Sequence, residues 1–257
     1  MILDTPALVS WLEDLAEAAE RDGFQVVRWG EAGGLPLLGL VRRSRPDRAR
    51  IYLSAGIHGD EPAGPLALER LIREGFFSSN PETTWTLCPV LNPRGWAAGK
   101  RETPEGIDIN RDYRRFLTSE AIAHAAWLRT RPANDLYLSL HEDWETEGFY
   151  LYEIDPRERP RFGERIVNRV AQVIPTESRE ELDDHRTAAP GVIRHPPRPD
   201  EMENWPEAIF HTNLHPHLSY TFETPSALPL EARVRAHMLA VKAAVSLFLE
   251  EWRPGER

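Results

Sequence analysis

The segment ARIYLSAGIHGDEPAG, residues 49–64, decides the fold, because it leads from a strand through a short loop into a helix. Its apolar run shows no alternation, which is typical of a strand covered on both faces. Pro62 stands near the first position of a helix predicted over residues 62–75, where the missing N–H does no harm. His58 and Glu61 lie in the loop between the two elements. We therefore expect this strand to end in a histidine and a carboxylate at one edge of a sheet.

Strands and helices alternate along the rest of the chain. The expected strands lie at residues 24–29, 35–43, 84–93, 135–143, 148–154 and 217–226. The expected helices lie at residues 6–21, 118–131, 159–174 and 230–252. Two stretches rich in turn-forming residues, 92–106 and 176–206, are expected to be loops. We predict a single domain over residues 1–257, an α/β three-layer sandwich with a mixed, largely parallel central sheet flanked by helices.

Composition excludes several classes of function. Hydrophobic residues make up 41% and charged residues 28% of the chain, as in ordinary globular proteins, so disorder is not expected. The net charge of −10 argues against a nucleic-acid-binding surface, which needs a basic stripe. No stretch approaches the roughly 18 apolar residues of a membrane span, and carboxylates interrupt the apolar part of the N-terminal segment, unlike a signal peptide. We therefore expect a cytoplasmic protein with neither nucleic acid nor membrane as a partner.

Cysteine chemistry is also restricted. Cys88 is the single cysteine of the chain, so an internal disulfide and a thiolate metal cluster are both excluded. Its neighbours in the sequence TLCPVLNP are apolar, and we expect Cys88 to act as a small buried hydrophobic residue.

Three of the expected strands end in side chains that can bind a metal or transfer a proton. These side chains are His58 with Glu61, His141, and Glu223. Ligands of open α/β sheets gather at the carboxyl ends of the strands. Two histidines and one carboxylate are the three protein ligands of a catalytic zinc site, with the fourth position open. We therefore predict a Zn²⁺ cofactor, with Glu223 as the base that serves a metal-bound water, although Glu223 alone could equally be a solvent-facing strand end.

The sequence between the two histidines carries a family resemblance. It contains NPRGWAAGKRETPEGIDINRDY, residues 92–113. Together with His-x-x-Glu before it, and a histidine and a glutamate after it, this ordered set resembles the zinc metallocarboxypeptidases of the carboxypeptidase A type, from about residue 51 to about residue 226. It is more distantly similar to succinylglutamate desuccinylase and aspartoacylase.

The resemblance implies a role for each matching residue. His58, Glu61 and His141 are the implied metal ligands, and Glu223 is the implied general base and acid. Asp108 is expected to accept a hydrogen bond from the far nitrogen of His58. Arg101 is expected to stabilise an oxyanion. Asn110 and Arg111 are expected to bind a substrate carboxylate. The plainer alternatives are loop salt bridges for the two arginines and a turn cap for Asp108.

Two departures from the family pattern bear on the substrate. Asp112 and Tyr113 stand where the family usually continues with Asn and an aromatic residue, so we expect Asp112 to add a negative charge near the carboxylate site and to select a substrate with an amine. The stretch before Glu223 offers only Tyr220, which lies too close to Glu223 to serve as the family's mobile substrate-capping tyrosine.

Other polar residues have simpler expected roles. His211 and His215 could bind a second metal if they lay on a helix, but Pro216 and the approaching strand argue against one, so we expect loop histidines that line the cleft. Glu142 follows His141 directly and is expected to face the opposite side of the strand. His124 is expected to pack inside the protein.

Three functions remain open. The first is a zinc-dependent peptidase or amidase that cleaves an amide beside a free carboxylate, similar to bacterial members that trim cell-wall peptides at a γ-D-glutamyl–diaminopimelate bond. The second is a deacylase of N-acyl amino acids, although the segment after Glu223 is short and is predicted to be one helix, whereas those relatives carry a β-rich segment. The third is a binding module on a degenerate peptidase fold. The expected partner is thus a small peptide or an N-acyl amino acid.

Overall fold

The computed structural model describes residues 4–156, 161–194, 199–215 and 217–251. Within these residues, eight strands form one sheet in the order β1-β2-β4-β3-β5-β10-β6-β9. The strands are β1 (Gln25–Ala32), β2 (Leu35–Arg42), β3 (Ala49–Ala55), β4 (Thr83–Cys88), β5 (Leu136–Asp143), β6 (Tyr150–Ile154), β9 (Val192–Arg194) and β10 (Leu218–Pro225). The four central strands β4, β3, β5 and β10 are parallel, β9 is parallel to β6, and the remaining pairs are antiparallel. The prediction of a mixed, largely parallel sheet is confirmed.

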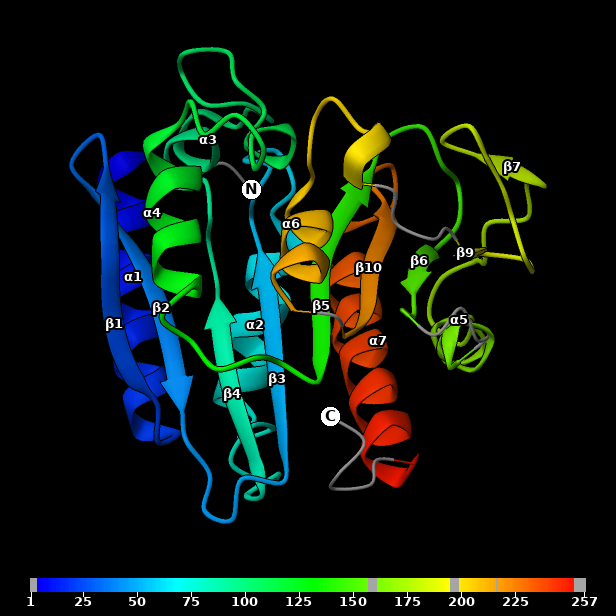
Figure 1. The fold of residues 1–257 in the computed structure, drawn as a ribbon, viewed down its shortest axis with the longest axis horizontal. Coiled ribbons are helices and arrows are strands. Elements are labelled where there is room, and N and C mark those ends of the chain that lie inside the picture. The colour runs from blue at the N-terminus through cyan, green and yellow to red at the C-terminus, as the bar shows by residue number, and fades with distance from the viewer. Residues whose placement is uncertain (1–3, 157–160, 195–198, 216, 252–257) are drawn as a thin grey trace.

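Helices cover both faces of this sheet (Figure 1). One face packs against α1 (Thr5–Arg21), α2 (Ala63–Arg73), α5 (Gly163–Val170) and α7 (Leu230–Glu251). The other packs against α4 (Ser119–Leu128) and α6 (Glu207–Leu214). The predicted three-layer sandwich is thus confirmed. No helix in the described part of the chain combines the length and apolarity that a membrane crossing requires.

The buried apolar residues form two main clusters, one on each face of the central sheet, because side chains alternate along the strands. Ile51 and Leu53 of β3 are fully buried in the larger cluster, under α2 and α7, whereas Tyr52 between them is fully buried in the cluster under α4 and α6. On β5, Leu138 and Tyr137 are divided in the same way. Because side chains alternate along a strand, this pattern assigns a face to every residue up to the strand ends.

Two segments expected to be loops contain regular structure. The stretch 92–106 begins with α3 (Pro93–Ala98). The stretch 176–206 contains the two-stranded pair β7 (Glu181–Leu182) and β8 (His185–Arg186), as well as β9 and a 3₁₀ turn at Pro199–Glu201; residues 195–198 lie outside the described residues. A three-residue strand such as β9 is stabilised by its pairing with β6, and local sequence does not reveal that pairing.

Helix α6 is a further correction, because the histidines of HTNLHPH were expected in a loop. The helix runs to Leu214, and Pro216 lies outside the described residues. His211 and His217 are buried beside Tyr137 and do not line the cleft. The expectation of cleft-lining loop histidines was therefore wrong for both residues.

Candidate metal centre

His58, Glu61 and His141 come together at the carboxyl ends of two neighbouring strands. His58 and Glu61 lie in the loop between β3 and α2, and His141 lies near the end of β5, which is parallel to β3. The main-chain N–H of Glu142 donates to Oε2 of Glu61 at 3.1 Å and so ties this loop to β5. All three side chains are buried.

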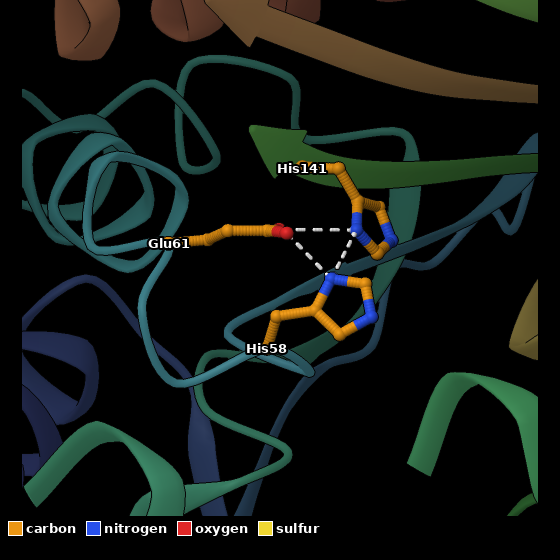
Figure 2. A group of neighbouring side chains, drawn as sticks. All are labelled: His58, Glu61 and His141. Atoms are coloured by element: carbon orange, nitrogen blue, oxygen red, sulfur yellow. Dashed lines mark hydrogen bonds and ion pairs between the residues drawn. The ribbon is translucent and has the colours of Figure 1, made fainter. Parts of the chain in front are cut away.

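The donor atoms of the three side chains face one another, as Figure 2 shows. Nδ1 of His58 is 2.5 Å from Oε1 of Glu61, and Nδ1 of His141 is 3.1 Å from Oε2 of Glu61 and 3.2 Å from Nδ1 of His58. A tetrahedral zinc ion with bonds of about 2.0–2.1 Å separates its ligand atoms by roughly 3.3 Å. The donor set and two of the three separations therefore fit a zinc ion.

Electrostatics in the cluster favour a positive charge between the three groups. Burial alone would lower the pKa of His58, but the charge of Glu61 and the contact with Asp108 raise it to about 9. Burial would raise the pKa of Glu61, whereas the two imidazoles hold it well below its usual range. The pKa of His141 is lowered, because burial outweighs the attraction of Glu61. A cation at this place is therefore stabilised by a buried, ionised carboxylate.

Asp108 and Arg101 extend the cluster on one side. Oδ1 of Asp108 is 3.4 Å from Nε2 of His58, the nitrogen that points away from Glu61. Nε of Arg101 donates to Oδ2 of Asp108 at 3.0 Å, and one of its terminal nitrogens is 3.5 Å from Glu61. Burial would raise the pKa of Asp108, but the contacts with His58 and Arg101 lower it. Asp108 thus lies where it can fix the ring orientation of His58.

Asn92 holds the loop that carries Arg101, a role that the sequence analysis did not identify. Its Oδ1 caps α3 by accepting from the N–H of Gly95 at 2.8 Å, and its Nδ2 donates to the carbonyl of Arg101 at 3.1 Å. Gly59 packs so closely on this turn that a Cβ there would lie 2.0 Å from the carbonyl carbon of Gly95. The Asn-Pro of the motif, which places an N-cap directly before a proline, was the available signal.

Glu223 lies beside the cluster without belonging to it. It is in β10, where it is the register partner of His141 on β5 and of Tyr150 on β6. Its pKa is raised well above the usual range, first by burial and then by the charges of Glu61 and Asp143. A carboxyl group with a raised pKa next to a metal centre is suited to exchange protons.

A cleft of about 670 Å³ opens over these residues. The predicted site residues that line it are His58, Glu61, Arg101, Asn110, Arg111, His141 and Glu223. Asn110 lies in a 3₁₀ turn capped by Asp108, and its Oδ1 accepts from the N–H of Glu207 at 2.9 Å. Arg111 is exposed at the cleft wall. The structure thus brings every predicted site residue to one place, with Asp108 directly behind His58.

Asp112 contradicts the prediction that it adds charge to the carboxylate site. It is 2% exposed and does not line the cleft. Its carboxylate instead accepts from the N–H of Leu117 at 2.9 Å and from the N–H and hydroxyl of Thr118, each at 2.8 Å. Asp112 therefore stabilises the turn that precedes α4, and a substrate amine cannot reach it.

Replacing Asp112 with alanine is expected to lower the free energy of unfolding by about 1–3 kcal/mol, because buried donors lose their acceptor. Urea unfolding measures this loss. The exposed Asp14 is the control, and D14A should change stability by less than about 0.5 kcal/mol. A D112A protein as stable as wild type would contradict the structural role.

Tyrosines on β6 form part of the cleft wall that the sequence analysis did not identify. The hydroxyl of Tyr150 donates to Asp143 at 3.0 Å, and that of Tyr152 donates to Asp183 at 2.7 Å. Both tyrosines line the cleft next to Glu223. The alternating tyrosines of GFYLYEI were the signal, since they share one face of a strand.

Glu142 faces away from the metal cluster, as predicted. It is buried, its Oε1 accepts from the N–H of Ala63 at 2.7 Å at the start of α2, and its Oε2 forms an ion pair with Arg233 of α7. Burial raises the pKa of Glu142 to about 7. It is therefore not a further ligand.

A second group of buried metal-binding residue types, formed by His124, Glu207 and His211, lies under the cleft. Tyr113 approaches Nδ1 of His124 at 2.6 Å, and Tyr52 approaches its Nε2 at 2.9 Å. Burial lowers the pKa of His124 to about 3, so it is neutral and bonds through both nitrogens. His124 and Glu207 are engaged in hydrogen bonds within the protein, whereas Nε2 of His211 lies 4.0 Å from Glu207 without a hydrogen-bond partner among the described residues. The hydrogen bonds of His124 agree with its expected packing role.

Comparison with known proteins identifies the family of this chain. Residues 47–184 match the model of the succinylglutamate desuccinylase/aspartoacylase catalytic domain. The match contains both histidines, Glu61, Asp108 and Arg101, and it spans more than half of the chain. The chain belongs to this family.

Solved structures similar to this family member share its fold. A candidate metallopeptidase from Shewanella amazonensis has a TM-score of 0.79 at 24% identity, with 98% of this chain and 94% of that chain covered. A second, from Shewanella denitrificans, has a TM-score of 0.79 at 23% identity, with coverage of 92% and 88%. A metallo-carboxypeptidase from Burkholderia cenocepacia has a TM-score of 0.65 at 18% identity, with coverage of 93% and 69%. The predicted relation to succinylglutamate desuccinylase and aspartoacylase is confirmed, and the fold is that of the metallo-carboxypeptidase from Burkholderia cenocepacia.

Proposed function

We propose that this protein is a zinc-dependent hydrolase that cleaves an amide bond next to a free carboxylate in a small peptide or acylated amino acid. The observation that carries the proposal is the convergence of His58, Glu61 and His141 at one edge of the sheet, with Glu223 beside them in the same cleft. Bound zinc supplies a Lewis acid and lowers the pKa of its water.

The residues around the cluster have complementary tasks. Glu223 takes a proton from the attacking water and passes it to the leaving amine. Arg101, held by Asp108, places fixed positive charge near the developing oxyanion. Asn110 and Arg111, on the wall of the same cleft, bind the free carboxylate of the substrate.

A second candidate is removal of the acyl group from an N-acyl amino acid. The match of residues 47–184 to the succinylglutamate desuccinylase/aspartoacylase catalytic domain favours it. Asp112 was expected to favour a substrate with an amine, such as a cell-wall peptide that contains diaminopimelate. Asp112 lies outside the cleft, so it does not support that substrate.

A panel of amides tests both candidates with the zinc-loaded protein. It contains dipeptides with a free carboxyl end, the same dipeptides with that end amidated, N-acetyl and N-succinyl amino acids, and the murein tripeptide. We expect cleavage only where the free carboxylate is present, with kcat/KM lowered at least about 100-fold by amidation. Equal cleavage of the amidated series would overturn the role of the carboxylate. Cleavage of the N-acyl amino acids alone would select the second candidate.

A further inference from the structure

Glu207 is a buried carboxylate that neither the metal cluster nor the proton transfer uses. It is the first residue of α6 and is 1% exposed. Its Oε1 accepts from the hydroxyl of Tyr52 at 2.7 Å, and its Oε2 accepts from the hydroxyls of Ser54 at 2.8 Å and Tyr137 at 3.0 Å. Tyr52 and Ser54 belong to β3 and Tyr137 to β5, the two strands that lead to the metal cluster. The side chain of Glu207 therefore links the start of α6 to β3 and β5.

The main chain of the same residue contacts the cleft wall. The N–H of Glu207 donates to Oδ1 of Asn110 at 2.9 Å. An amide side chain whose oxygen is held by a donor must turn its NH₂ group the other way. Asn110 lines the cleft, so this hydrogen bond leaves Nδ2 as the end that can donate to a ligand. A carboxylate is an acceptor and needs such a donor.

The buried carboxylate of Glu207 is not explained by a gain in the free energy of unfolding. Burial raises the pKa of Glu207 to about 7, although the three hydroxyls act to lower it. Apolar residues in place of both the carboxylate and its three hydroxyl partners would generally be as stable or more stable. What a fully satisfied polar network does provide is a fixed orientation. The three hydroxyls fix the carboxylate, and with it the N–H that orients Asn110.

We propose that Glu207 is a positioning residue for substrate binding, which holds the Asn110 amide with Nδ2 directed toward the substrate carboxylate. The inference rests on the proposed function, because the proposed function assigns Asn110 to that carboxylate. Glu207 acts through Asn110 and not on the reacting atoms, so its loss should raise KM and leave kcat nearly unchanged.

The test measures KM and kcat of E207Q, N110A and the double variant with the best carboxylate-bearing amide of the panel. Glutamine keeps the size of the side chain but cannot accept all three hydroxyls, so we expect KM to rise about tenfold with kcat within about threefold of wild type. In the double variant, KM should rise no further than in N110A, because both changes remove one interaction. Additive effects on KM would overturn the proposal.

Glu153 provides a matched control. It is a buried carboxylate on β6 that accepts from Tyr220 at 2.9 Å and from Arg194 at 2.7 Å, and it does not line the cleft. E153Q should lower thermal stability but leave KM unchanged. If E153Q raises KM as much as E207Q does, general destabilisation explains both and the proposal is wrong.

Two further measurements keep the test decisive if E207Q folds poorly or the enzyme proves inactive. S54A removes one donor to Glu207 from beneath the cleft, and it should raise KM about two- to threefold; an unchanged KM counts against the proposal. A zinc-loaded wild type without hydrolytic activity overturns the proposed function alone. The crystal structure of S54A or E207Q then decides the inference, and an unmoved Asn110 amide overturns it.

Discussion

Replacing Glu223 with glutamine is expected to lower kcat by about 10²–10⁴-fold, the usual contribution of a positioned proton-transfer group, while zinc content stays unchanged. The register of the sheet gives the physical reason. Glu223 is the partner of His141 across β5 and β10, on the same face of the sheet, but the donor cluster is formed by other residues. Glutamine preserves the volume of the side chain and cannot take up a proton. Steady-state kinetics and elemental analysis of the same preparations measure the two quantities.

The matched control for E223Q is again E153Q, a carboxylate-to-amide change one strand away and outside the cleft. Its kcat should remain close to that of wild type. If E223Q turns over at the wild-type rate, Glu223 is not the base. If E223Q also loses zinc, the lost activity reports on the metal and not on proton transfer.

The sequence was sufficient to predict those site residues whose positions follow from the order of the strands in the sheet. Parallel strands end at the same edge of a sheet, so a histidine near the end of β5 and the loop after β3 meet once the two strands are neighbours. The orientation of Glu142 followed from alternation along the same strand. Asp108 was placed by the family pattern, and the structure puts it 3.4 Å from His58.

The part that could not be predicted depends on contacts between distant segments. Helix α6 has a weak sequence signal, and its first residue is held by hydroxyls from β3 and β5, far away in the chain. Asp112 gave a misleading signal, because a carboxylate next to Arg111 can face either the cleft or the turn behind it. Which of these happens depends on the donors of Leu117 and Thr118, and a linear pattern does not show where they point.

Replacing either imidazole of the cluster is expected to reduce bound zinc from about one ion per chain to near zero, since a site with two protein ligands does not hold a catalytic zinc tightly. H58A and H141A test the two sides of the cluster separately, because one ligand comes from the loop after β3 and the other from β5. His215 at the end of α6 lies outside the cluster, and H215A should keep its zinc. Dialysis against a zinc buffer followed by elemental analysis measures the occupancy.

Replacing Asp108 should reduce zinc binding less than replacing either histidine. This difference distinguishes a metal centre from three side chains that only hydrogen-bond to one another. Within the metal cluster Asp108 contacts the far nitrogen of His58 and no donor atom that faces the centre, so D108N should weaken zinc binding by about 10–100-fold without abolishing it. In a triad without metal, zinc content would stay equally low in all variants, and the variants would differ only in stability. A metal centre instead requires the order wild type and H215A, then D108N, then H58A and H141A. That order follows from which atoms face the centre of the cluster, and zinc binding that is equal in D108N and H58A would contradict it.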